Sequence, residues 1–181
     1  MYSFEQNSPQ IHPSAFVAPM SYISGNVKIA EHSSVWPMCV LRGDISFIEI
    51  GKYTNIQDGT VCHVTHASEF NGNQEFPLKV GDYVTVGHGA ILHACTVKDF
   101  ALIGMGSTIL DGSVIESNTI VGANSLVTAG KKLESGFLWA GSPVKKVREL
   151  NDSERKFFKY SAEYYAKLAE RTHNSNSDYS F

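Results

Sequence analysis

The sequence predicts an all-β protein, a parallel β-helix of hexapeptide repeats followed by a single α-helix. Three observations lead to this prediction. Apolar residues recur every six positions, a small or β-branched residue usually follows four positions later, and a helical pattern appears only near the end. A period of six is neither the 3.6 of an α-helix nor the plain alternation of a strand. A fixed internal period is typical of solenoid architectures.

The apolar positions form four runs. They are Ile11, Val17, Ile23, Ile29 and Val35; Ile50, Ile56 and Cys62; Val80, Val86 and Leu92; and Val97, Ile103, Ile109, Ile115, Val121 and Val127. Ordinary strand alternation is the alternative, since six is a multiple of two, but the intervening even positions are often polar or charged. We therefore expect each hexapeptide to form one side of a triangular coil. Three hexapeptides complete one coil, and successive coils stack about 4.8 Å apart.

The pattern divides the chain into five parts. Residues 1–10 form an N-terminal arm, 11–130 the β-helix, 131–150 an exit segment, 151–172 a C-terminal helix packed alongside, and 173–181 a flexible tail. A loop insertion at about residues 66–78 interrupts the β-helix and lacks the repeat. Asp152 or Ser153 can cap the helix, whose aromatic stripe includes Phe157, Phe158, Tyr160, Tyr164 and Tyr165. We expect the stripe to pack on the protein's own flank or on a neighbouring subunit.

Composition argues against several classes of protein. The 181 residues carry a net charge of −3 and no basic patch, so nucleic acid is not an expected partner. Neither a long apolar run nor a signal sequence is present, so we expect no membrane span and no secretion. The three cysteines are odd in number and not closely paired, which favours a reducing, cytoplasmic setting.

Two histidines occupy equivalent positions in the repeat. His63 and His93 each follow an apolar interior position, so both side chains point outward. The interval between them is five hexapeptide lengths, and if the loop inserts two of these lengths, the remaining three make one coil. His93 then stacks over His63 at about one strand spacing. Two imidazoles so placed could converge on a metal with bonds of about 2.0–2.1 Å.

A third histidine, His88, projects from an adjacent face and cannot reach that ion within one chain. Asp58 lies one coil below His88, and Gln57 belongs to the same face. Two β-helices placed side by side would bring the face with His63 and His93 against the face with His88. A three-sided prism with two such complementary faces closes as a homotrimer, so the sequence predicts metal sites at trimer interfaces.

The composition of the predicted site indicates its chemistry. Three neutral imidazoles leave one coordination position for water, which is typical of a catalytic zinc that makes hydroxide available at neutral pH. Gln57 could orient that hydroxide, and Asp58 or Asp44 could fix an imidazole tautomer or position an arginine. Arg42 and Asp44, in a slip of the repeat, could form a local turn pair or a contact across subunits.

Taken together, these residues resemble the γ-class carbonic anhydrase-like family of hexapeptide-repeat proteins over about residues 10–170. The matching pieces are Val40-Leu41-Arg42-Gly43-Asp44, Thr54-Asn55-Ile56-Gln57-Asp58-Gly59, His63-Val64-Thr65-His66, Val86-Gly87-His88 with Leu92-His93, and Leu102-Ile103-Gly104-Met105-Gly106. Their joint presence is highly specific.

The resemblance implies a left-handed β-helix, a homotrimer and a lyase activity, the reversible hydration of CO2 to bicarbonate. It implies zinc, with Fe2+ or Co2+ as alternatives, held by His63 and His93 of one subunit and His88 of the next. It also implies roles for the remaining site residues: an inter-subunit ion pair between Arg42 and Asp44, handling of the metal-bound water by Gln57 and Asp58, binding of CO2 or bicarbonate by Asn55, and an approach of Tyr165 to the site.

One departure from the family leaves alternatives open. Efficient members carry an acidic loop with a glutamate that shuttles the proton, whereas the loop here is short, and Glu69, Glu75 and His66 are the candidate replacements. The alternatives are a hexapeptide acyl- or acetyltransferase, a thioester hydrolase that uses the same metal, or a metal-binding homologue with weak or no catalysis. A transferase needs one histidine as general base and a coenzyme A groove, with no need for three converging imidazoles.

Overall fold

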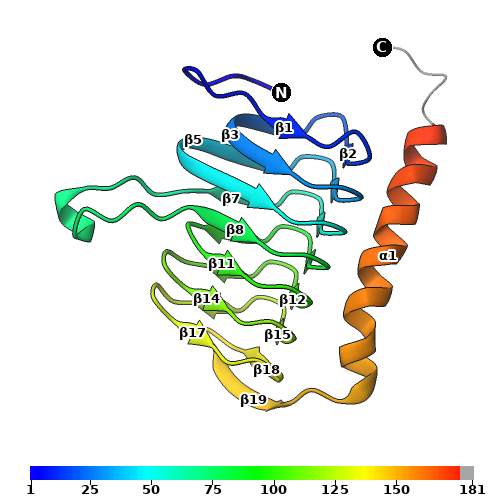
Figure 1. Cartoon of the computed structure of the whole chain (residues 1–181). Coiled ribbons are helices and arrows are strands. Elements are labelled where there is room, and N and C mark those ends of the chain that lie inside the picture. The colour runs from blue at the N-terminus through cyan, green and yellow to red at the C-terminus, as the bar shows by residue number, and fades with distance from the viewer. Residues whose placement is uncertain (176–181) are drawn as a thin grey trace.

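The computed structural model describes residues 1–175 and consists of a three-sided parallel β-solenoid with one helix along its side (Figure 1). The prediction of an all-β repeat fold with a single C-terminal helix is confirmed. The architecture is consistent with the left-handed hexapeptide fold that the resemblance implies.

Each side of the solenoid is a stack of short parallel strands. The first face contains the N-terminal parts of β3 (Tyr22–Ile29) and β5 (Val40–Ile50), then β7 (Val61–His63), β10 (Ile91–His93), β13 (Thr108–Ile109) and β16 (Leu126–Val127). The second face contains β1 (Gln10–Ile11), the C-terminal parts of β3 and β5, β8 (Leu78–Val80), β11 (Thr96–Val97), β14 (Val114–Ile115) and β17 (Lys132–Leu133). The third face contains β2 (Phe16–Val17), β4 (Ser34–Val35), β6 (Asn55–Ile56), β9 (Thr85–Val86), β12 (Ala101–Ile103), β15 (Thr119–Val121) and β18 (Phe137–Ala140).

The predicted apolar positions fill the interior. From Ile23 to Val127 every member of the four runs is at most 3% exposed. The small residues of the repeat lie at the corners, where hydroxyl groups donate to carbonyls of the next coil: Thr54 Oγ1 to Gly81 O at 2.7 Å and Ser107 Oγ to Gly122 O at 2.9 Å. A small polar residue at this position is therefore favoured because it satisfies a backbone group that the turn would otherwise leave unpaired.

The stack continues beyond residue 130, where the hexapeptide pattern predicts its end. Leu133 and Trp139 take the next two interior positions after Val127, at intervals of one hexapeptide, and are 0% and 6% exposed. β17 pairs with β14, and β18 pairs with β15, both in parallel. The segment 131–150 therefore begins with two further sides of the solenoid and leaves it only after Ala140.

Each end of the stack is covered on one face by chain that departs from the repeat. At the N-terminal end, the backbone of Tyr2 donates to Ile23 O and its ring stacks on Tyr22 at 4.9 Å. At the C-terminal end, β19 (Lys145–Glu149) pairs with β18 in the antiparallel sense.

The C-terminal helix α1 (Asp152–Ser175) runs along the third face (Figure 1). Its first turn is fixed by reciprocal hydrogen bonds, because Glu154 N donates to Asn151 Oδ1 and Asn151 N donates to Glu154 Oε2, both at 2.9 Å. The face against the solenoid includes Phe158, at 2% exposed. The helix extends past residue 172, and residues 176–181 of the predicted tail lie outside the described residues.

The aromatic stripe of α1 divides between two environments. Phe158 is buried, and the ring of Tyr165 packs edge-on against Trp36 at 5.7 Å between centroids. Phe157, Tyr160 and Tyr164 are 45%, 63% and 48% exposed. Only part of the predicted stripe therefore packs on the protein's own flank.

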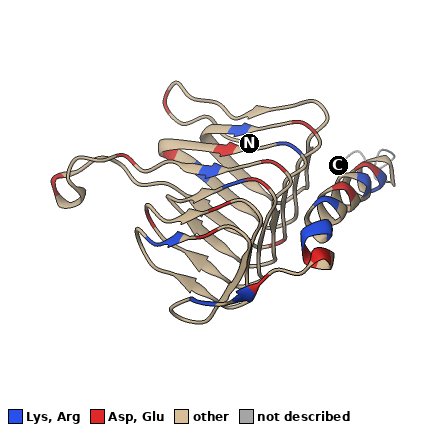
Figure 2. Ribbon diagram, turned by 60° about the horizontal axis from the view of Figure 1, so that its bottom comes forward, with Lys and Arg blue, Asp and Glu red and all other residues tan. Residues whose placement is uncertain are grey.

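Charge is dispersed over the surface. Figure 2 shows Lys and Arg interspersed with Asp and Glu on the solenoid and along α1. Within residues 1–175, no helix has the length and apolar character needed to cross a membrane.

Two insertions occur at a single corner, the one between the first and second faces, which we call the insertion corner. Interior residues Leu41 and Ile50 are one and a half hexapeptide lengths apart there, and Cys62 and Val80 are three lengths apart, where the repeat has one. The larger insertion spans residues 64–77 and contains the short 3-10 helix η1 (Glu69–Asn71). It projects away from the solenoid (Figure 1).

Candidate metal centre

His63 and His93 lie next to each other where β7 and β10 reach the insertion corner. The two residues are direct partners in the parallel pairing of these strands, as the residue count predicts. Nδ1 of His63 lies 3.2 Å from Nε2 of His93. Two nitrogens bound at about 2.0–2.1 Å to one tetrahedral ion would be about 3.3 Å apart. The spacing of these two ring nitrogens therefore fits two ligands of a single metal.

A carboxylate holds the opposite nitrogen of each ring. Asp44 Oδ1 lies 3.0 Å from His63 Nε2, and Asp111 Oδ1 lies 2.6 Å from His93 Nδ1. A carboxylate accepts hydrogen bonds, so these contacts put the proton of each neutral ring on the nitrogen that faces the carboxylate. The lone pairs of both rings then face the space between them, as in carboxylate–histidine–metal arrangements.

The local electrostatics favour a neutral His63 ring beside an ionised Asp44. Burial lowers the pKa of His63, and the nearby Arg42 adds to this effect while Asp44 opposes it. Burial raises the pKa of Asp44, but hydrogen bonds from Arg42 and His63 outweigh it, and the net pKa lies below the usual value. A neutral imidazole is the form that binds a metal ion.

Arg42 and Asp44 form an ion pair within the chain. Asp44 belongs to the smaller insertion, which carries its carboxylate over His63 in the next coil. The sequence left open a local pair or a contact across subunits, and the single chain shows the local pair. A contact across subunits would need a second copy of the chain and stays a prediction.

His88 lies at a different corner, between the third and first faces. Its Nδ1 is 2.9 Å from Asp58 Oδ2, and both side chains are 48% exposed. Within residues 1–175 of one chain, no group of three or more His, Cys, Asp or Glu side chains could hold a metal ion. His88 is thus a third imidazole with one ring nitrogen, Nδ1, held by a carboxylate. It lies on a separate edge of the prism.

A buried chain of polar side chains connects this second corner with α1. Gln57 Nε2 donates to Asn55 Oδ1 at 3.0 Å, and Asn55 Nδ2 donates to Thr85 Oγ1 at 3.0 Å. The hydroxyls of Thr85 and Ser161 are 2.9 Å apart. Gln57 and Asn55 are 5% and 1% exposed, so burial and hydrogen bonds hold their amides in fixed orientations.

Tyr165 on α1 completes the surroundings of this corner. Burial raises the pKa of its hydroxyl, and the negative charge of Asp58 adds to the effect. The phenol therefore stays protonated at neutral pH. It could donate a hydrogen bond near Asp58.

The three candidate proton carriers all lie in the larger insertion. His66, Glu69 and Glu75 have exposed side chains. The tip folds on itself, since Ser68 N donates to Asn71 Oδ1 and Asn71 Nδ2 donates to His66 O, both at 2.8 Å.

Sequence reasoning assigned no role to Asp111 or to its partner Thr65. Thr65 Oγ1 donates to Asp111 Oδ2 at 2.5 Å. A signal was available in the repeat, because Leu92 pairs with Ile109 and Asp111 therefore lies one residue past the position one coil after His93. An acidic residue one coil after a candidate ligand is placed to reach it from the neighbouring turn.

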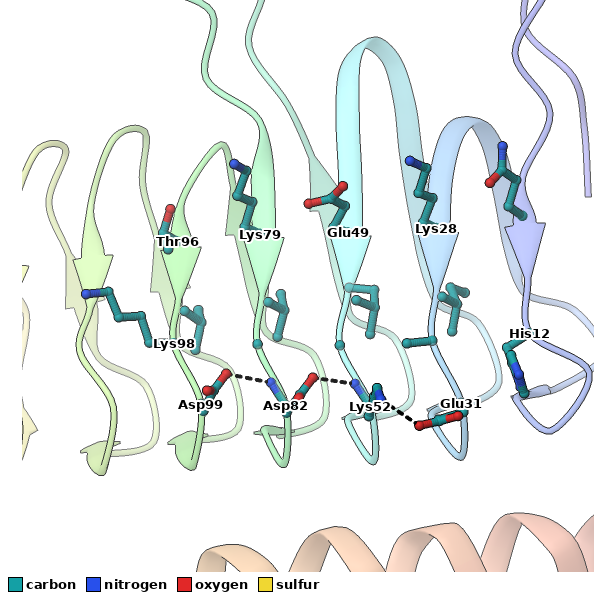
Figure 3. Close-up of a pocket in the computed structure, with 18 of the residues that line it drawn as sticks. His12, Lys28, Glu31, Glu49, Lys52, Lys79, Asp82, Thr96, Lys98 and Asp99 are labelled. Carbon is teal, nitrogen blue, oxygen red and sulfur yellow. Dashed lines mark hydrogen bonds and ion pairs between the residues drawn. The ribbon is translucent and has the colours of Figure 1, made fainter.

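A groove of about 830 Å3 lies elsewhere, on the second face (Figure 3). Gly51 and Gly81 form part of its floor. The carboxylates of Asp82 and Asp99 accept hydrogen bonds from the backbone N–H groups of Lys52 and Asp82 at 2.7 and 2.9 Å. A Cβ at Gly51 would lie 2.4 Å from Asp82 Oδ1. The glycines are thus required because each leaves room for an aspartate that bonds to the backbone of the neighbouring coil. The shape of the groove follows from this repeated corner structure.

The fold and the paired imidazoles define a hexapeptide-repeat solenoid protein with a candidate metal centre. No family model matches the chain. Over 159 residues it is 46% identical to Protein YrdA of Escherichia coli, covering 88% of this chain and 86% of the relative. It is 44% identical to gamma carbonic anhydrase 2, mitochondrial, of Arabidopsis thaliana, covering 94% of this chain but only 60% of that longer protein. The chain belongs to the γ-carbonic anhydrase-like family of hexapeptide-repeat proteins.

A solved structure shows the same architecture. A hexapeptide transferase family protein from Anaplasma phagocytophilum superposes with a TM-score of 0.86 at 40% identity, covering 93% of this chain and 95% of that protein. The relatives thus carry the names of two activities on one fold, and the choice between them depends on the site.

Proposed function

We propose that this protein is a γ-carbonic anhydrase-type lyase that hydrates CO2 reversibly to bicarbonate. In this proposal a divalent metal, zinc or alternatively Fe2+ or Co2+, is held by His63 and His93 of one protomer and by the partner's His88 in a homotrimer. The observation that carries the proposal is the 3.2 Å separation of His63 Nδ1 and His93 Nε2, with a carboxylate on the far side of each ring. The names of the gamma carbonic anhydrase relatives support it.

When bound, the metal supplies a Lewis acid that makes water nucleophilic near neutral pH. The chain's own residues would then bind and orient the reactants. The amides of Gln57 and Asn55 are buried and mutually hydrogen-bonded, so they offer fixed polar groups for a small oxygen-containing substrate. Asp58 holds His88 and could accept a proton, while Arg42 neutralises Asp44 behind His63. A site already arranged in this way needs little reorganisation during the reaction.

An exposed apolar column on the first face supports the trimer. Tyr22, Val61 and Ile91 point outward from β3, β7 and β10 and are 42%, 39% and 42% exposed. The first face lies between the corner with His88 and the insertion corner. Contact between copies over this face would cover the apolar column and bring the two kinds of histidine together.

The proposal is tested by stopped-flow CO2 hydration on metal-loaded protein compared with His88→Ala. We expect the variant to lose both activity and bound metal. Equal CO2 hydration rates for the wild type and His88→Ala would reject the proposal that the protein is a carbonic anhydrase. Equal rates near zero with a full metal complement would identify a metal-binding homologue with weak or no catalysis.

A mixing experiment tests whether the site is shared. His63→Ala and His88→Ala protomers are each expected to be inactive alone. When they are unfolded and refolded together, an interface that joins the intact His63 and His93 of one protomer to the intact His88 of the other regains a complete site. Partial recovery of metal binding and activity is expected, and no recovery in a mixed oligomer would contradict the shared site.

An acyltransferase is the second candidate, because the similar protein from Anaplasma phagocytophilum carries the name hexapeptide transferase. Metal content discriminates, since transfer from an acyl thioester needs a histidine base and no metal. Acyl transfer by metal-free protein would favour this candidate. Metal-dependent hydrolysis of the thioester would favour the thioester hydrolase.

Proton removal would use the larger insertion, whose candidates are His66, Glu69 and Glu75. Replacing the group that carries the proton is expected to lower the CO2 hydration rate in weak buffer, with rescue by high concentrations of a small buffer.

For the location of the protein we propose the cytoplasm, which suits three buried free thiols, Cys39, Cys62 and Cys95.

A further inference from the structure

The base of the larger insertion, which we call the neck, is clamped onto a turn that lies beyond His93. Thr65 and Phe76 exchange two backbone hydrogen bonds of 3.0 Å across the neck. The ring of Phe76 lies against Gly112, where a Cβ would be 3.2 Å from Phe76 Cε1. Gly112 N donates to Ala94 O at 2.8 Å. An insertion that starts directly after His63 therefore folds back over the turn after β13, and Gly112 joins that turn to the one that follows His93.

A chain of hydrogen bonds runs from this neck to the candidate ligand. Thr65 Oγ1 donates to one oxygen of Asp111, and the other oxygen lies 2.6 Å from His93 Nδ1. The carboxylate has two partners on two different elements. Its position is therefore set jointly by the insertion and by the histidine.

The two carboxylates behind the paired rings are anchored differently. Asp44, behind His63, is paired with the cation Arg42 and is only 12% exposed. Asp111, behind His93, is 34% exposed and depends on the hydroxyl of Thr65. A neutral hydroxyl on a projecting loop is a weaker anchor than a guanidinium. Of the two ligands, His93 is thus the one whose orientation depends on the insertion.

We propose that Asp111 is a positioning residue that holds His93 in the Nδ1–H tautomer with Nε2 free for the metal, and that Thr65 couples closure of the neck to metal affinity. This inference rests on the proposed metal site. By linkage, a neck that strengthens metal binding when closed must itself be stabilised by the metal, to the same extent. Loosening the neck would then release metal without any change in the three ligands.

The first test uses metal-free protein, so it does not depend on the metal site. Imidazole 15N shifts in histidine-labelled protein report which nitrogen of His93 carries the proton. We expect the Nδ1–H tautomer in the wild type and a mixture of tautomers in Asp111→Ala. The same Nδ1–H population in both proteins would overturn the positioning role.

The second test measures zinc affinity by competition with a chelator. Loss of a partner behind a ligand typically costs about 10–100-fold in affinity, so we expect that range for Asp111→Ala and a smaller loss for Thr65→Val. Thr65→Val removes only the hydroxyl and keeps the backbone bonds to Phe76. Thr65→Ser, which restores a hydroxyl, should bind like the wild type.

Asp99→Ala is the matched control, because Asp99 is also an aspartate at a corner. Its carboxylate accepts a hydrogen bond from Asp82 N beside the groove of the second face and does not contact the paired histidines. It is expected to lower thermal stability without changing zinc affinity. If Asp99→Ala weakens zinc binding as much as Asp111→Ala, general destabilisation explains both and the inference falls. If the wild type binds no zinc, the proposed function fails, and the tautomer of His93 still decides the role of Asp111.

Hydrogen exchange gives the reciprocal readout. Zinc should slow exchange at the amides of Thr65 and Phe76 in the wild type, and this protection should shrink in Thr65→Val. Equal protection in the two proteins would exclude the coupling through Thr65.

Discussion

The coils on the two sides of β10 differ in how strictly they keep the repeat. From β11 to β18 the strands stack at intervals of three hexapeptide lengths, as between Thr96 and Val114, or Thr108 and Leu126. From β5 to β10 the intervals on the first face are longer, by half a hexapeptide before β7 and by two hexapeptides before β10. The three candidate ligands, His63, His88 and His93, lie in this irregular half, whereas Asp111 comes from the strict half. The comparison teaches that strict coils act mainly as scaffold and that added residues bring further side chains, such as Asp44, to the paired histidines.

The additions are tolerated because they occur at a corner. On the first face, which precedes the insertion corner, Cys62 pairs with Leu92. On the second face, which follows that corner, Ile48 pairs with Leu78. The insertions therefore leave the strand register of both faces intact. A longer loop adds only a slowly growing entropic cost. New side chains such as Asp44 and Thr65 can thus be placed beside His63 without disturbing the interior.

The largest effect should follow from a cavity in the strict half. Ile109 is fully buried between neighbouring coils, and Ile109→Ala is expected to cost about 2–5 kcal/mol of unfolding free energy. Urea denaturation followed by circular dichroism measures it. A cost below about 1 kcal/mol would contradict the scaffold role of these coils.

A substitution in the irregular half should change zinc affinity much more than the free energy of unfolding. His63→Ala should weaken zinc binding by more than about 100-fold, because even partners behind a ligand contribute about 10–100-fold. The metal-free protein should lose only about 1 kcal/mol, the scale of a single hydrogen bond. His12→Ala, at an exposed histidine outside the site, is the control. A large stability loss in His63→Ala would erase the distinction between the two halves.

The start of α1 offers a test by pH. Hydrogen bonds from Arg148 and from the backbone of Asn151 lower the pKa of Glu154 from 4.5 to about 2. Because the folded pKa is the lower one, this stabilisation is complete above about pH 4.5 and is lost as the pH falls toward 2. Glu154→Gln should therefore be destabilised at pH 7 and differ little from the wild type at pH 2, measured by thermal unfolding. Equal destabilisation at both pH values would refute the charge-based cap.

The smallest effect should follow from shortening the tip of the insertion. Replacing residues 68–73 with two glycines keeps the pairing of Thr65 with Phe76 and should change stability by less than about 1 kcal/mol. Zinc affinity should also stay within about twofold if only the neck is coupled to the metal. A large loss of affinity would move the coupling from the neck to the tip.

Much of this fold was predictable because the interior of a solenoid repeats in sequence. The same period explains the stacking of His63 on His93, since the insertion adds two hexapeptide lengths. The continuation to Trp139 was missed because the intervening residues lack the small corner pattern. Asp111 was missed although its position about one coil after His93 was available from the repeat, and Thr65 was missed because it lies in an insertion, where no period relates sequence to position. The sequence left open whether the aromatic stripe of α1 packs on the solenoid or on a neighbouring subunit, because periodicity gives a stripe but not which part of it meets the solenoid.

The partly covered ends of the stack have a consequence for how copies associate. A solenoid exposes unpaired strand edges at its top and bottom, and such edges can recruit further chains into fibres. Tyr2 occupies backbone groups at one end, and the reversed direction of β19 ends the parallel ladder at the other. Growth along the axis is thereby discouraged. Association is directed to the sides of the prism, where a closed ring of finite size can form.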